Sequence, residues 1–391
     1  MNIRKLTGLE LQQARYIWSQ SFERGDRAME EWNAWEERTP NGKSTYGIFE
    51  ASALTAAFLL VDESIHLGRD TVLPMSAVCG VGVLPASRGR GYATCGVPFL
   101  FERMRESGRH ISFLEPFHWE FYGRLGYAWT APTRKYTVPT TAMASSPETE
   151  HVRAASAEDR PGIIECYSRF SGGYRGMLVR KPEVWDWRFD ASKKEATYTY
   201  LYERGNGVEG YLFLHGGKRK MTQIDELIAR TPRALQGLLG LLRRHEMQTE
   251  KFQWDAPADD NLWSTLMSTK VETKIFSRTM ARIIDVAGAL QALSPSPDLQ
   301  GVVALKVVDE TAPWNARTWR VECESGALTV SHCHDEAQVS ITIQALTQAF
   351  LGSPTLSLLR AAGQVIVHDE AAFDVLASLL GGPPAWCNDG F

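Results

Sequence analysis

Short apolar runs alternate along the chain with longer stretches whose apolar residues recur every three or four positions. The run 75–84, made of small and β-branched residues, predicts a buried strand, and Pro85 ends it. After a Gly/Arg loop at 88–94, apolar residues at helical spacing continue to Met104 and predict a helix. Further strands are expected at 3–6, 45–50, 53–61 and 111–114, and a further helix at 8–22. This alternation predicts a mixed α/β (α+β) fold for the first part of the chain.

The Gly/Arg loop has the features of an anion site. The first N–H groups of the following helix have no intrahelical partner, and the helix dipole places positive potential there. Gly89 and Gly91 lack a Cβ, so a diphosphate could approach the backbone closely. Arg88 and Arg90 can add charge-assisted hydrogen bonds. The loop contains neither a Walker-type nor a dinucleotide-binding glycine pattern, and a plain solvated strand–helix turn is the alternative interpretation.

Two residues inside the predicted helix are unusual for a helix interior. Gly96 and Pro98 both lie there, and Pro98 cannot donate a hydrogen bond to the carbonyl of Thr94. An interior proline costs ~3 kcal/mol and usually kinks the helix. We expect bent packing about two turns beyond the loop, without loss of the anion site.

The pattern then repeats in a second part of the chain. Residues 138–151 form a polar, proline-containing linker, and beyond it Thr231, followed by proline, marks a strong helix start. Helices are expected at 157–170, 183–189 and 233–245, and strands at 198–203, 210–215 and 223–228. The Gly/Arg loop is absent from this copy. We therefore expect a first domain at 1–138, a degenerate second copy at 152–283 that cannot cradle a diphosphate, and a third domain at 285–391.

The third part carries a possible metal pattern. Strands are expected at 301–308, 317–323, 327–331 and 339–343, and helices at 285–296, 345–351, 355–362 and 370–380. His332 and His334, with Cys333 between them, would share a strand face, but a third ligand is not evident. A solvated strand edge is the favoured interpretation, so no metal is predicted.

Length, charge and cysteine usage limit the function classes. A chain of 391 residues suggests two or three domains, and a net charge of −4 gives no electrostatic footprint for nucleic acid. No apolar run is long enough to span a bilayer, and the N-terminus lacks a signal core, so we expect a cytoplasmic protein without membrane partners. The six cysteines are scattered without a Cys-x-x-Cys pair, which favours reduced thiols.

Residues 23–38 combine acidic and aromatic side chains and leave two interpretations open. A solvated helix whose aromatic stripe joins the core is the favoured one. The sharper one is the wall of an acceptor pocket, in which Trp32 and Trp35 line the inside and carboxylates such as that of Asp26 face a cationic amine.

Two motifs resemble those of the GNAT acetyltransferases. The spacing Arg88-x-x-Gly91-x-Ala93 resembles their acyl-CoA loop, Gln/Arg-x-x-Gly-x-Gly/Ala. About thirty residues on, 121–127 (FYGRLGY) resembles the segment where these enzymes place a short helix and a terminal strand. The resemblance implies that Tyr122 lies beside the thioester sulfur; the alternative is a core aromatic residue.

The whole chain resembles the Eis family (enhanced intracellular survival proteins). The stretch 305–322, with Asp309 and Asn315, is similar to sterol carrier protein-like modules, and it follows the two acetyltransferase-like parts. The resemblance implies tandem GNAT folds, with mixed sheets flanked by helices, followed by a sterol carrier protein-like α/β domain. Family members end in a phenylalanine whose α-carboxylate reaches the first active site, and the sequence here ends with Asn388-Asp389-Gly390-Phe391.

The resemblance also implies a reaction. Acetyl-CoA would be the co-substrate, without a metal, and a small-molecule or peptide amine the acceptor: an aminoglycoside, a polyamine or a lysine-type amine. The carboxylate of Phe391 would act as general base, the hydroxyl of Tyr122 as general acid, and backbone N–H groups at 81–83 would polarise the thioester oxygen. The implied acetyl-CoA contacts are Val81, Gly82, Val83, Arg88, Gly89, Arg90, Gly91, Tyr92, Ala93, Thr94, Phe117 and His118. The family further suggests a homo-oligomer, a hexamer.

Two alternative functions remain open at this point. One is a lipid or acyl-CoA carrier that uses an apolar tunnel beneath the strand 302–308 of the last domain. The other is a peptide or protein N-acetyltransferase, which differs from the first hypothesis only in the acceptor.

Overall fold

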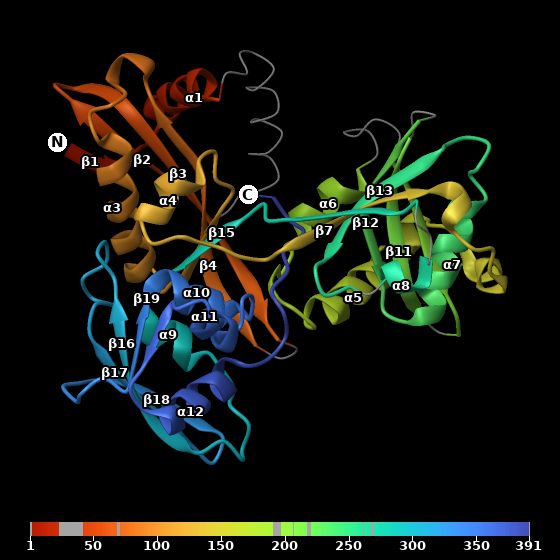
Figure 1. The fold of residues 1–391 in the computed structure, drawn as a ribbon. Helices are drawn as coiled ribbons and strands as arrows, with labels where there is room; N and C mark the ends of the chain where they lie inside the picture. The colour runs from red at the N-terminus through yellow and green to blue at the C-terminus, as the bar shows by residue number, and fades with distance from the viewer. Residues whose placement is uncertain are drawn as a thin grey trace.

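The computed structural model describes residues 2–22, 42–68, 71–190, 197–205, 207–216, 220–260, 262–266 and 270–390. Over these residues the strands form three sheets, which Figure 1 shows as three lobes: the first mainly red to orange, the second mainly green, and the third mainly cyan to blue. Sheets flanked by helices confirm the predicted mixed α/β class.

The first sheet is built around a long strand that is buried on both faces. This strand, β3, sends Ala57 and Leu59 toward helix α1 and sends Phe58 and Leu60 toward helix α3, because successive side chains alternate. The sheet order is β1-β2-β3-β4-β5-β15-β6, with β9 also paired to β3. The bounds are β1 (Asn2–Lys5), β2 (Lys43–Glu50), β3 (Ala53–Leu67), β4 (Val72–Val83), β5 (Ile111–Leu114), β15 (Met280–Ile283), β6 (Ala128–Trp129) and β9 (Arg175–Leu178).

Helix α3 (Tyr92–Glu106) runs without a break through Pro98. Gly96 faces the sheet, where an added Cβ would lie only 2.1 Å from Cζ of Phe58. Glycine at this position therefore lets the helix approach the sheet closely. The unusual glycine is explained by packing, while the bend expected at Pro98 stays a prediction.

The second sheet has the order β14-β7-β13-β12-β11-β10-β8. Helix α7 begins as its sequence indicates, because the Thr231 hydroxyl accepts a hydrogen bond from the backbone N–H of Ala234. The bounds are β14 (Glu272–Phe276), β7 (Thr133–Pro139), β13 (Lys251–Pro257), β12 (Thr222–Ala229), β11 (Val208–His215), β10 (Thr197–Glu203) and β8 (Val152–Ala154).

The first two sheets exchange strands across the expected boundaries. Strand β7, which begins inside the expected first domain 1–138, lies within the second sheet between β14 and β13. Strand β15, inside the expected second domain 152–283, returns to the first sheet and lies between β5 and β6. Figure 1 shows both strands crossing between the two lobes. The linker composition at 138–151 marks a turn region, but the sheets do not divide there.

The third sheet, of order β18-β17-β16-β19-β20, shares its hydrophobic core with the first. Val303, Leu305 and Val307 on β16 are 0–2% exposed and belong to the same buried cluster as Ile111 and Phe113 of β5. The first and third lobes are thus packed as one body. The bounds are β18 (Ala327–Cys333), β17 (Thr318–Glu324), β16 (Gly301–Val308), β19 (Val339–Thr342) and β20 (Val365–Val367).

The helices cover these sheets, and none in the described part of the chain is long and apolar enough to cross a membrane. Their bounds, besides α3, are α1 (Leu9–Ser21), α4 (Trp119–Arg124), α5 (Arg160–Ser171), α6 (Pro182–Phe189), α7 (Pro232–Arg243), α8 (Leu262–Leu266), α9 (Val286–Gln291), α10 (Ile343–Leu351), α11 (Leu356–Ala361) and α12 (Glu370–Leu380).

The chain after α12 leaves the third lobe and runs toward the other two. Its Pro384 carbonyl accepts from the Arg175 N–H at 2.9 Å, and the Trp386 N–H donates to the Arg175 carbonyl at 3.0 Å. This pairing with β9 buries Trp386 against Phe170 and Tyr174. Figure 1 shows this dark-blue segment passing between the lobes.

Candidate functional site

Strand β4 has one open edge over its C-terminal half. Within the described residues, β5 pairs with β4 only over Met75–Ala77, whereas β3 stays paired with β4 as far as Val83. Because backbone polar groups alternate between the two edges of a strand, some of those at 78–83 face the gap between β4 and β5. These groups are available to a ligand.

The gap opens where β4 bends. In the pairing of β3 with β4, Leu59 lies opposite Gly80 and Leu60 opposite Val78. Cys79 is therefore the extra residue of a β-bulge, which bends a strand and increases its local twist. The bulge explains why β5 follows β4 no further than Ala77.

The loop after β4 needs its two glycines. Gly89 and Gly91 have φ of 80° and 79°, a left-handed conformation that side-chain-bearing residues rarely adopt. No described atom lies within 4 Å of where a Cβ would be on either residue. The loop thus presents bare backbone to open space, as a diphosphate site requires.

The N-terminus of α3 is uncapped and follows this loop. The Cys95 N–H makes the first helical bond, to the Gly91 carbonyl at 3.0 Å, so the three preceding N–H groups have no intrahelical acceptor. No side chain in the described part of the chain caps this end. Together with the helix dipole, these N–H groups favour an anion.

A cavity of about 580 Å³ joins the loop, the strand end and the helix N-terminus. Its lining comes from α1, β4, the loop, α3 and the α4 region. The lining residues are Ser21, Phe22, Val81, Val83, Ser87, Arg88, Gly89, Gly91, Tyr92, Ala93, Thr94, Phe117 and Phe121. Most of the residues that the sequence singled out for acetyl-CoA therefore lie around one hollow.

Three of the expected contact residues do not line this cavity: Gly82, Arg90 and His118. Gly82 faces α1, where a Cβ would lie 2.8 Å from Cδ1 of Trp18. The Arg90 guanidinium pairs with the Glu50 carboxylate at 3.0 Å, which leaves Arg88 as the loop's arginine at the cavity.

Tyr122 lies on α4 directly beneath two aromatic residues of the cavity wall. Its ring meets those of Phe117 and Phe121 edge to face, with centroids 5.7 and 5.0 Å apart. The side chain is 4% exposed, and its hydroxyl makes no hydrogen bond within the described residues. Burial raises the pKa of Tyr122 well above its usual value, so the hydroxyl keeps its proton at neutral pH.

The hydroxyl of the neighbouring Tyr127, unlike that of Tyr122, is hydrogen-bonded within the described part of the chain. Its hydroxyl shares a 2.8 Å hydrogen bond with the Ser112 hydroxyl, and its ring contacts Tyr122 at a centroid distance of 5.9 Å. Burial also raises the pKa of Tyr127. Because the Tyr127 hydroxyl is already paired, Tyr122 carries the available proton donor of this pair.

The far C-terminal segment is anchored between the first and second lobes by buried charges. The Asp389 carboxylate accepts from the Arg180 Nε at 2.9 Å and from the Arg188 Nη2 at 2.8 Å. Arg180 also binds Glu226 of β12, whose Oε2 accepts from the Asn388 side chain at 3.0 Å. The tail is thereby fixed to the second lobe two residues before the end of the sequence.

This anchoring brings the tail to the mouth of the β4–β5 gap. A Cβ on Gly390 would lie 3.1 Å from Oε1 of Glu115, the residue that follows β5. The described chain thus ends beside the strand that forms one side of the gap.

Several expected site residues lie outside the described residues. These are Asp26, Trp32 and Trp35 of the possible acceptor wall, and Phe391. Their expected roles stay predictions.

All six cysteines are free thiols, and Cys166, Cys323 and Cys387 are buried. Burial raises the pKa of Cys79, and also that of Cys166 and Cys387, in each of the latter two to about 12. Their thiols are therefore protonated at neutral pH. Among the described residues, no group of three or more His, Cys, Asp or Glu side chains could hold a metal ion.

Three residues of the cavity wall were not expected as site residues: Ser21, Ser87 and Phe121. Phe22, which also lines it, begins the aromatic stripe considered for the acceptor pocket. Phe121 directly precedes Tyr122 in the 121–127 motif, so the motif itself could have marked Phe121 as a site residue. Ser21 and Phe22 come from the end of α1, which reaches the cavity only because Gly82 lets α1 pack closely against β4. No local signal marks that approach.

Three family models match consecutive parts of the chain. Residues 2–130 match an acetyltransferase (GNAT) domain, residues 176–283 match a second acetyltransferase (GNAT) domain, and residues 286–388 match a sterol carrier protein domain. The expected order of two GNAT parts and a sterol carrier protein part is confirmed.

Relatives and solved structures agree with this order. An uncharacterized N-acetyltransferase from Streptomyces avermitilis is 24% identical over 358 residues, 86% of each chain, and one from Streptomyces coelicolor is 25% identical over 309 residues, 74% of each. A GCN5-related N-acetyltransferase from Anabaena variabilis has a TM-score of 0.89 at 19% identity, over the whole of both chains. Eis1 from Mycobacterium abscessus has a TM-score of 0.80 at 22% identity, also over both whole chains. These structures share the fold of the chain across all three lobes.

The buried charges around Asp389 predict a pH-dependent stability. Although burial opposes the charged form, the guanidinium groups of Arg180 and Arg188 hold the pKa of Glu226 far below its usual 4.5. A lowered folded-state pKa adds stability that is complete above the unfolded-state pKa and is lost as the pH falls below it. Glu226→Gln should therefore lower the free energy of unfolding at pH 7 by about 3 kcal/mol or more and flatten its decline between pH 6 and pH 3.

Urea unfolding at a series of pH values measures both effects. Glu165→Gln is the control, because Glu165 pairs with Arg169 on the exposed surface and such pairs contribute at most about 1 kcal/mol. If the free energy of unfolding of Glu226→Gln falls with decreasing pH as steeply as that of the wild type, the buried network does not determine the loss of stability in acid.

Proposed function

We propose that this chain, which matches two acetyltransferase (GNAT) domains followed by a sterol carrier protein domain, transfers an acetyl group from acetyl-CoA directly to an amine in its first domain. One observation supports this proposal most directly. The Gly89–Gly91 backbone, which no described side chain covers, and the uncapped start of α3 both face one cavity, which lies beside the free edge of β4. The second GNAT domain lacks a corresponding Gly/Arg loop and serves as scaffold.

The residues around the cavity fit acetyl-CoA. The N–H groups at the start of α3 would bind the diphosphate, and the exposed Arg88 would add a charged donor beside it. Val81 and Val83 would lie along the pantetheine arm, where the free edge of β4 offers backbone groups to its amides. Acetyl-CoA supplies the activated thioester, and this chain's residues bind it and move the protons.

Tyr122 would act as the general acid. The departing sulfur needs a proton, and the Tyr122 hydroxyl carries one at neutral pH, as tyrosines ordinarily do; burial raises its pKa further. It lies behind Phe117 and Phe121, two residues of the cavity wall. Backbone N–H groups at 81–83 would stabilise the negative charge that develops on the thioester oxygen.

The carboxylate of Phe391 would act as the general base. Acetyl transfer needs a neutral amine, whereas amines with a pKa near that of lysine are protonated at neutral pH. The support is indirect: Asp389 is anchored by two arginines, and Gly390 lies beside Glu115 at the end of β5. A carboxylate one residue further would be within reach of the gap.

The acceptor is proposed to be a small-molecule or peptide amine, and the oligomeric state is proposed to be a homo-oligomer, as the family suggests. A panel of polyamines, aminoglycosides and lysine peptides, with release of free thiol from acetyl-CoA as the readout, would identify the acceptor. The carrier alternative has little support, because the side chains beneath β16 pack into a core shared with the first lobe.

The first prediction concerns the loop. Gly91→Val should weaken acetyl-CoA binding at least ~10-fold in calorimetry, because a branched side chain would fill the space that the diphosphate needs. Gly108→Val is the matched control: Gly108 also has a positive φ and open surroundings, but it follows the other end of α3. Equal affinities in both variants would remove the loop from the cofactor site.

The second prediction concerns the proton donor. Tyr122→Phe should lower kcat by ~10²–10⁴-fold while the Kd for acetyl-CoA stays within about threefold, because only the hydroxyl is removed. Tyr127→Phe is the control; it breaks the bond to Ser112 and should cost stability of about 1 kcal/mol with little change in kcat. Wild-type turnover of Tyr122→Phe would leave Tyr122 as a packing residue.

The third prediction concerns the last residue of the sequence. Adding six residues after Phe391 should abolish transfer while acetyl-CoA still binds, because the carboxylate would be moved while the diphosphate loop is untouched. The same six residues placed before Met1 are the control. Equal activity of both extended proteins would refute a role for the Phe391 carboxylate.

A further inference from the structure

The helix that carries Tyr122 is too short to determine its own position. Helix α4 has six residues, and a helix of this length is not stable by itself in water. Its last turn closes through hydrogen bonds from the Leu125 and Tyr127 N–H groups to the Tyr122 carbonyl, at 3.0 and 3.1 Å. The carbonyls of Gly123 and Leu125, which follow, also accept hydrogen bonds from side chains more than 150 residues further along the chain.

One of these carbonyls, that of Leu125, is bound by a buried arginine. Arg282 Nη1 on β15 donates to it at 2.6 Å, and the Thr311 hydroxyl of the third domain donates to it at 3.3 Å. Gly126 makes this approach possible: its φ is +84°, and a Cβ there would lie 1.6 Å from Nη1 of Arg282. The guanidinium occupies the space that any other residue at 126 would fill.

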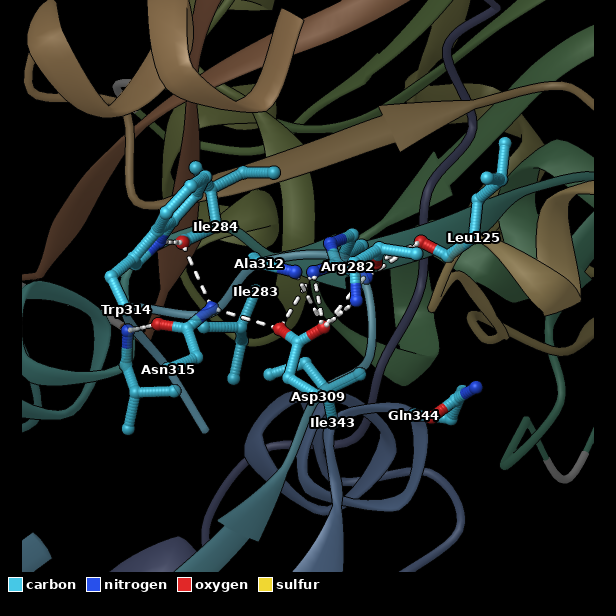
Figure 2. A network of polar contacts seen from close by, with 12 residues as sticks. Leu125, Arg282, Ile283, Ile284, Asp309, Ala312, Trp314, Asn315, Ile343 and Gln344 are labelled. Atoms are coloured by element: carbon cyan, nitrogen blue, oxygen red, sulfur yellow. Dashed lines mark hydrogen bonds and ion pairs between the residues drawn. The ribbon is translucent and has the colours of Figure 1, made fainter. Parts of the chain in front are cut away.

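The third domain holds this arginine in place. Asp309, the residue after β16, accepts two hydrogen bonds from Arg282 Nη2, at 2.8 and 2.6 Å, and both side chains are fully buried (Figure 2). The same carboxylate accepts from the side chain of Asn315 and from the N–H of Ala312, each at 3.1 Å. Figure 2 shows these donors converging on Asp309 from both sides. The position of the Asp309 carboxylate is therefore fixed by donors on both sides.

A second contact from the third domain reaches α4 directly. Gln344 on α10 donates from Nε2 to the Gly123 carbonyl at 3.1 Å. One turn further along α10, Gln348 donates from Nε2 to the Trp129 carbonyl at 2.8 Å, beyond the end of α4 and on β6. The two glutamines thus make similar bonds to two different elements.

We propose that the third domain acts as a clamp that positions the Tyr122 hydroxyl, with Arg282, Asp309 and Gln344 as positioning residues. A buried ion pair adds little net stability by itself, because both charges lose their hydration. Its geometric effect is larger: it fixes where the carbonyl end of α4 lies relative to β15. The inference rests on the proposed role of Tyr122, and it gives the sterol carrier protein domain a task that needs no lipid.

The test compares Gln344→Ala with its matched control Gln348→Ala. Gln344→Ala should lower kcat about 10-fold, because a small misplacement of a catalytic group has a large effect on rate, while KM for acetyl-CoA stays within twofold. Gln348→Ala should leave kcat unchanged. Gln344→Lys, which restores a donor, should recover most of the activity. The assay uses acetyl-CoA and the acceptor of highest turnover from the amine panel.

The same substitutions are then made in Tyr122→Phe. If Gln344 acts through the hydroxyl, Gln344→Ala should lower the residual kcat of Tyr122→Phe by less than twofold, because the group it positions is gone. A full 10-fold further loss would overturn the proposal, and so would equal effects of Gln344→Ala and Gln348→Ala on the wild-type background. If Tyr122→Phe alone has wild-type kcat, Tyr122 is not the general acid. That outcome refutes the proposed function of Tyr122 and is distinct from a failure of the clamp.

Hydrogen exchange tests the clamp without any acceptor. Peptides covering 119–127 should exchange faster in Gln344→Ala than in Gln348→Ala, while peptides of α3 exchange at the wild-type rate in both. Unchanged protection of 119–127 in Gln344→Ala would overturn the clamp whatever the activities are.

Discussion

The fold depends on one constraint: the first domain cannot complete its own sheet. Its β6 has no direct pairing with β5, because β15 lies between them, and β15 arrives only after the chain has passed through the second domain. Strand β7 makes the opposite crossing into the middle of the second sheet. The segment with Tyr122, which lies between β5 and β6, therefore takes its place only when later parts of the chain are folded.

Buried charges lie at two further junctions between the parts of the molecule. Arg282 and Asp309 join the first and third lobes, and Arg180 with Glu226 and Asp389 joins the tail to the second lobe. Removing charges from water is expensive, so such pairs persist only where geometry and hydrogen bonds satisfy both partners. Breaking such a pair leaves an uncompensated buried charge, so the observed arrangement is favoured over one in which the partners separate. The catalytic proposals both depend on that arrangement: the position of α4 depends on the first pair, and the path of the tail depends on the second.

The loop and the Tyr122 segment could be located from the sequence because their signals are local. Two glycines, a strand that ends at a proline and a helix start lie within a few residues of one another, and this spacing predicts an anion site. The assignment of Arg90 shows the limit of this reasoning. Arg88 and Arg90, separated by one glycine, look equivalent in sequence, but only the structure shows that Glu50, on the neighbouring hairpin, pairs with Arg90 and that Arg88 lines the cavity. Similarly, Gly96 looked unfavourable for a helix until Phe58 was found packed against it.

The sequence by itself determined the mixed α/β class, the order of most helices and strands, and the motifs of the first domain, since periodicity, capping and turn residues act over a few neighbouring positions. Only the tertiary structure decided which sheet each strand joins. Strands β7 and β15 carry no local mark of their partner, because strand pairing is set by contacts far apart in the chain. For the same reason Asp309, Gln344 and Asp389 gained a place in the site only from the fold: each acts on a group more than 25 residues away, at a junction that exists once the exchanged strands have paired.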